Sequence, residues 1–131
     1  MNRFHAFAAL AALALCSCAP EVAVPVKLEA GAADPLHLHH VKARSDRDGV
    51  LVSGQADGPR LGYAHRGSVV ITLDAGSEMP FQQRCVEEPI SRRKDPVGSF
   101  AVRFMNVPPE QVRGVTVDVR AECPKLSRLP N

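Results

Sequence analysis

The stretch FAVRFM, residues 100–105, decides the fold of this chain. Its large apolar residues Phe100, Val102 and Phe104 occupy every second position, and Arg103 lies between two of them. An alternation with a period of two is typical of a β-strand that buries one of its faces. We therefore expect a strand here, with the apolar residues facing a core and Arg103 facing solvent.

The same period recurs along most of the chain. Val115, Val117 and Val119 alternate with polar residues, and the phase continues through Ala121 to place Cys123 inward as well. Further extended runs cover residues 37–44, 50–55, 68–74 and 81–86, and Asp48-Gly49 between the first two is a hairpin signal. No convincing helical pattern follows residue 18.

These runs predict an all-β domain, a small antiparallel β-sandwich of about six to seven strands. The pattern resembles that of immunoglobulin and fibronectin-type-III domains. The chain has no Trp, however, and Cys85 and Cys123 both lie late in it, so the strand order stays open and a small barrel is the alternative. A fold of this kind does not by itself specify a function.

The first 17 residues have the composition of a secretory signal. Arg3 supplies a basic start, an apolar run from residue 4 to 15 follows, and Ser17 is small. A run of about 12 apolar residues is too short for a permanent transmembrane helix and suits a signal peptide that is removed.

The signal ends in Leu15-Cys16-Ser17-Cys18, which resembles the lipobox of bacterial lipoproteins. The resemblance implies cleavage before Cys18 and acyl chains, palmitate among them, on the sulfur and amino group of that residue. Ala19, rather than Asp, follows the cysteine, which by the sorting habit of this family implies the outer membrane, facing the periplasm. The alternative is ordinary cleavage near Ala19 and a soluble secreted protein.

Residues 18–35 are expected to be a tether between the lipid and a domain that covers residues 36–131. The segment contains three prolines and a run of small residues, a composition typical of linkers. Alternating apolar residues at 22–28 leave a second possibility, a short edge strand, with which Pro25 is compatible.

Charge and motifs exclude several function classes. The formal net charge of the chain is +2, and removal of the signal takes Arg3 with it, so nothing indicates nucleic-acid binding. The sequence contains no serine-hydrolase, zinc-protease or phosphate-loop motif, and we predict a protein that is not an enzyme and has no resident cofactor.

Cys85 and Cys123 remain as an even pair after the signal is removed and Cys18 is acylated. In an exported chain such a pair predicts a disulfide, and two buried free thiols are the alternative.

Two sets of residues could bind a partner. His37 and His39 would share one face of a strand, with their Cα atoms roughly 6.6 Å apart, while His40 points the other way. Two imidazoles on one face can bind Zn²⁺ or Cu²⁺. His65, Met79 and Met105 are possible additional ligands. The other set is basic and consists of Lys42 and Arg44 on the expected edge strand 37–44 and of Arg92, Arg93 and Lys94 in a loop.

The sequence therefore predicts a non-catalytic, membrane-anchored envelope lipoprotein that binds or scaffolds another envelope protein through its surface. A periplasmic metal-binding protein that uses the His37–His40 cluster is the alternative. The two differ in whether metal raises the melting temperature of the protein.

Overall fold

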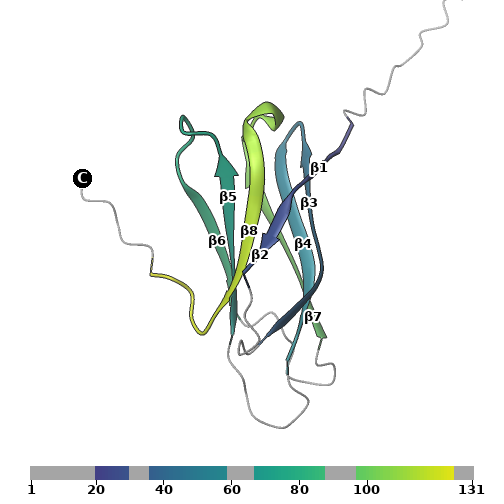
Figure 1. Ribbon diagram of the computed structural model, residues 1–131, viewed down its shortest axis with the longest axis vertical. Helices are drawn as coiled ribbons and strands as arrows, with labels where there is room; N and C mark the ends of the chain where they lie inside the picture. Colours follow the sequence, from purple (N-terminus) through teal and green to yellow (C-terminus); the bar gives the residue numbers. More distant parts are fainter. Residues whose placement is uncertain (1–19, 30–35, 59–66, 88–96, 126–131) are drawn as a thin grey trace, which may run out of the picture.

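Two four-stranded β-sheets pack face to face in the computed structural model, which describes residues 20–29, 36–58, 67–87 and 97–125 (Figure 1). The predicted all-β sandwich is confirmed. The first sheet has the order β1 (Val22–Val24), β3 (His37–Asp46), β4 (Gly49–Asp57), β7 (Val97–Met105). The second has the order β2 (Val26–Leu28), β8 (Val112–Arg120), β5 (Ser68–Ala75), β6 (Gln82–Glu87), and a 3₁₀ turn, η1 (Pro109–Gln111), precedes β8.

The strand order differs from that of immunoglobulin domains. All paired strands are antiparallel except β2 and β8, which are parallel. β4 follows β3 through a tight turn and stays beside it in the first sheet. In the constant-type immunoglobulin order the third strand instead crosses to the opposite sheet.

The core lies between the sheets and consists mainly of valine. Phe104, Ile71 and Val117 are completely buried, and Phe100, Val115 and Val119 are at most 5% exposed. The inward phase predicted for β7 and β8 is therefore confirmed, with Val102 half-buried and packed against the core. The phase does not extend to Ala121, which is exposed because β8 ends at Arg120.

Residues 22–28 belong to the sandwich, so the expectation of a tether over this segment is wrong. β1 pairs with β3 and buries Val24, and β2 pairs with β8. The alternative, an edge strand, is correct, except that the segment forms two short edge strands, because the chain passes from the first sheet to the second at Pro25. The carbonyl of Pro25 accepts a hydrogen bond from the Val115 amide at 3.0 Å, which secures this crossing.

The predicted hairpin at Asp48-Gly49 is confirmed. The Asp46 carboxylate accepts hydrogen bonds from the amides of Asp48 (2.8 Å) and Gly49 (3.1 Å). Gly49 has a φ of +142°, and a Cβ at this position would overlap the carbonyl oxygen of Phe104. Both the positive φ and the close strand require glycine here.

A β-bulge interrupts β3. His39 pairs with Gln55 and Lys42 with Ser53, so the two residues between them oppose only Gly54. His40, at the bulge, has a φ of +51°. The extra residue shifts the phase of the strand, so His40 is exposed on the same outer face as Lys42, and the expectation that it points away from its neighbours is wrong.

Candidate functional site

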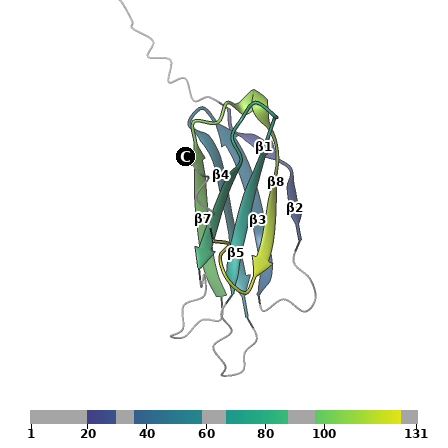
Figure 2. The ribbon, with the colours of Figure 1, turned by 90° about the vertical axis from the view of Figure 1, so that its left-hand side faces the viewer.

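The free edge of β7 is the most distinctive surface of the described residues. β7 is the last strand of the first sheet and pairs with β4 over its whole length, from Val97 opposite Asp57 to Met105 opposite Gly49. No described strand pairs with its other side, which lies at the left margin of the molecule in Figure 2.

The direction of the backbone groups of β7 follows from one hydrogen bond. The Asn106 amide donates to the Asp48 carbonyl at 3.2 Å, towards β4. Backbone groups alternate in direction along an antiparallel strand, so the even-numbered residues of β7 bond to β4. The amides and carbonyls of Ser99, Ala101 and Arg103 therefore face the free edge.

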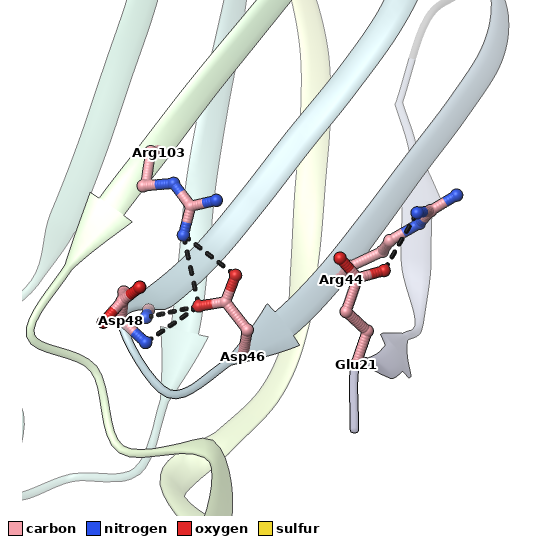
Figure 3. A network of polar contacts seen from close by, with 6 residues as sticks. Glu21, Arg44, Asp46, Asp48 and Arg103 are labelled. Carbon is pink, nitrogen blue, oxygen red and sulfur yellow. Dashed lines mark hydrogen bonds and ion pairs between the residues drawn. The ribbon is translucent and has the colours of Figure 1, made fainter. Parts of the chain in front are cut away.

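Within β7 itself, the sequence features that usually prevent pairing are absent. β7 contains no proline and no lysine, and its register with β4 has no irregularity. Its one charged residue, Arg103, forms an ion pair with Asp46 on the outer face of the sheet. Arg103 Nη1 lies 3.0 Å and 3.1 Å from the two carboxylate oxygens of Asp46 (Figure 3).

The same contacts lower the pKa of the Asp46 carboxyl group. The hydrogen bond from Arg103, followed by that from the Asp48 amide, holds the pKa of Asp46 below its ordinary value. The carboxylate thus joins the β3–β4 turn to β7 and keeps the Arg103 guanidinium on the sheet face.

In the second sheet, which has β2 and β6 at its edges, β6 is protected in a different way. Val86 packs against the core, and Arg84, two residues earlier, lies on the same inward face. The Arg84 guanidinium carbon lies 5.7 Å from the centroid of the Phe104 ring, and the side chain reaches solvent. An inward-pointing charge at a sheet edge disfavours pairing with another strand, so β6 and β7 differ as docking edges.

The outer face of the first sheet carries small residues beside the basic residues of β3. A shallow depression there is lined by Lys42, Arg44, Ser53, Gln55, Ser99 and Ala101. Arg44 bonds the Glu21 carboxylate at 2.9 Å (Figure 3), so its charge is partly balanced. The predicted basic contacts Lys42 and Arg44 thus lie on an exposed face, whereas Arg92, Arg93 and Lys94 lie outside the described residues.

The expectation that residues 37–44 form the docking edge is wrong for the end of the strand. β1 pairs with β3 from Ala43 to Ser45, which places this part of β3 inside the sheet. Alternation in a single strand shows which residues face the core, but it does not show which strands lie beside it. Sequence reasoning missed the edge of β7 for that reason.

The histidines form a pair with a carboxylate rather than a larger cluster. His39 Nε2 lies 3.0 Å from Asp57 Oδ2, and His37 lies two residues earlier on the same face. The described part of the chain contains no group of three His, Cys, Asp or Glu residues that could hold a metal ion. Met105 lies at the opposite end of the first sheet, and His65 is outside the described residues, so metal binding at His37 and His39 stays a prediction.

The predicted disulfide between Cys85 and Cys123 is present, with a Cα–Cα distance of 5.8 Å. It lies on the outer face of the second sheet and not in the core. Cys85 pairs with Val70, which points away from its core neighbours Val69 and Ile71. Cys123 follows the end of β8 by three residues, so the expected inward phase of this residue is wrong.

The bond holds the chain after β8 beside Val70, which is only 1% exposed although it faces outward. The run of three consecutive apolar residues at 69–71 was the available sign that both faces of β5 are covered.

Comparison of the chain with protein-family models, with curated proteins and with solved structures finds no match. The described residues include no helix that is long and apolar enough to cross a membrane. Cys18 lies outside the described residues.

Proposed function

We propose that this protein is a non-catalytic lipoprotein of the cell envelope that binds another envelope protein by adding one of that protein's strands to β7. The observation that carries the proposal is the free edge of β7, nine residues of regular strand without a described partner on one side. The N-terminal signal that ends at Cys18 supports attachment to the outer membrane.

The affinity of strand addition at this edge would come mainly from backbone hydrogen bonds between β7 and the added strand. Each new backbone hydrogen bond contributes about 0.5–1.5 kcal/mol net, so several of them support a specific complex. The small outward residues Ser99 and Ala101 leave room for the side chains of an incoming strand. The basic residue Lys42 lies on the same face and favours a partner strand with acidic residues.

Anchoring would strengthen such a contact without further interactions. Acyl chains on Cys18 would confine the domain to a thin layer at the membrane, which raises its effective concentration near other anchored proteins.

Strand addition at β7 is tested by removing one backbone amide that forms no hydrogen bond with β4. The Ala101 amide faces the free edge, so Ala101→Pro should weaken the complex while leaving the ladder with β4 intact. Ala101→Val is the matched control, because it adds bulk at the same exposed position and keeps the amide. A photo-crosslinker at Ala101 in intact membranes should capture the partner, and one at the half-buried outer-face residue Thr72 in the second sheet should not.

Equal capture at Ala101 and Thr72, or equal loss of binding in the Pro and Val variants, would exclude β7 as the docking edge. Membrane attachment is tested separately by the mass of the mature protein. Acyl chains should be present on Cys18, and Cys18→Ser should release the protein from membranes or block its processing.

A further inference from the structure

One end of the sandwich lies where the chain enters the domain. Val22, the first residue of β1, pairs with Ser45, next to the turn between β3 and β4. The turn between β5 and β6 and the 3₁₀ turn η1 lie at the same end, which is the upper end of the domain in Figure 1. We call this group of turns the entry end.

The entry end is close to the acylation site along the chain. Glu21 is held against β3 by its 2.9 Å ion pair with Arg44. Cys18 is three residues earlier, and three residues span at most roughly 10 Å. Because residues 22–28 are strands and not a tether, acyl chains on Cys18 would keep the entry end near the bilayer surface.

The entry end also carries three of the five large apolar side chains that are exposed among the described residues. Phe81, Val22 and Met105 are 75%, 54% and 53% exposed, and all three lie there. The other two large exposed apolar residues are Leu28, on β2, and Val97, at the far end of β7. A Phe side chain left in water forgoes about 1.5–3 kcal/mol of burial, so a phospholipid interface would stabilise this arrangement.

We propose that the entry end lies against the phospholipid surface, with Val22, Phe81 and Met105 at the level of the headgroups. The inference rests on the lipid anchor of the proposed function and adds an orientation to it.

The charges at the entry end indicate whether its contact with the lipid surface is apolar or electrostatic. Asp48, Glu78 and Glu110 are exposed there, together with Arg47 and Arg113. These are three acidic and two basic side chains, so this end has no excess of positive charge to attract anionic lipids, and the contact is apolar rather than electrostatic. It should form on zwitterionic lipids and change little with ionic strength.

This orientation has a consequence for the binding edge. β7 runs from Val97 to Met105, so it would run towards the bilayer. A partner strand that pairs with it in the antiparallel direction would start at the membrane surface and run away from it. The partner that fits is thus a protein whose extended segment emerges from the same membrane.

The absence of Trp from the chain makes single-tryptophan reporters unambiguous. The acylated mature Phe81→Trp protein, which begins at Cys18, is reconstituted into phosphatidylcholine vesicles whose acyl chains are brominated near the headgroup. Val97→Trp is the matched control, because it is also an exposed apolar position and lies eight residues, roughly 26 Å, from Met105 along β7. Met105→Trp reports on the entry end independently if the first variant folds poorly.

The indoles at positions 81 and 105 should lose most of their fluorescence in brominated vesicles, and the indole at position 97 should keep most of it, at low and at high salt. Equal quenching at both ends, or stronger quenching at position 97, would overturn the orientation but leave the proposed anchor and edge standing. Lack of acyl chains in the mass of the mature protein would overturn the anchor and the orientation together.

Discussion

Replacement of Phe104 by Ala tests the core and the register of β7 at once. Phe104 is completely buried, and the Arg84 guanidinium carbon lies 5.7 Å from the centroid of its ring. Loss of a buried Phe costs about 3–5 kcal/mol, which combines the transfer of the side chain with the cavity that remains. The loss of the cation–π contact, about 0.5–1 kcal/mol for an exposed cation, is a minor part of that cost.

The assay is urea unfolding of the mature protein, followed by far-UV circular dichroism. The free energy of unfolding should fall by about 3–5 kcal/mol without a change in its dependence on urea. The melting temperature of a domain this size should fall by on the order of 15 °C.

Met105→Ala is the control, because this neighbouring side chain is 53% exposed and its loss should cost no more than about 0.5 kcal/mol. Arg103→Ala should cost more than Met105→Ala, since it leaves the Asp46 carboxylate without its strongest partner. If Phe104→Ala and Met105→Ala cost the same, the faces of β7 have been assigned wrongly and the strand lies in another register.

Three further predictions concern single contacts. Arg103 lowers the pKa of Asp46 in the folded state. The ionised Asp46 carboxylate therefore contributes its full share of the stability above the pKa of the unfolded state, about 4, and this share is lost as the pH falls through the lower pKa of the folded state. The difference in unfolding free energy between the native protein and Asp46→Asn should therefore shrink in acid denaturation series. Reduction of the Cys85–Cys123 bond, which closes a separation of 38 residues, should lower the stability by about 4 kcal/mol in the chain-entropy model, measured by urea unfolding with and without reductant. Gly49→Ala should cost at least about 1–3 kcal/mol, because the positive φ is strained for alanine and its Cβ meets a carbonyl oxygen; a cost below that of an ordinary surface substitution would contradict the turn geometry.

The sequence alone determined that the domain is all-β, with a β-sandwich predicted and a small barrel left open, and which faces of its clearest strands are buried. Alternation is a local property, since each residue of a strand points to the side opposite its neighbours. Phe100, Phe104 and Val117 could therefore be assigned to the core from the printed letters. The disulfide followed from an even pair of cysteines in an exported chain, and the turn at Gly49 from the preference of such turns for glycine.

Only the tertiary structure decided which strands are neighbours, and the surfaces that matter depend on that. The alternation at residues 22–28 was compatible with a tether or with an edge strand, and these residues are strands because β3 and β8 provide hydrogen-bond partners. The bulge at His40 changed the phase within one strand, and the end of β8 at Arg120 put Cys123 outside the core. The free edge of β7 arises because, among the described strands, only β4 pairs with it, and backbone hydrogen bonds between distant segments leave no mark in the side-chain pattern of either segment.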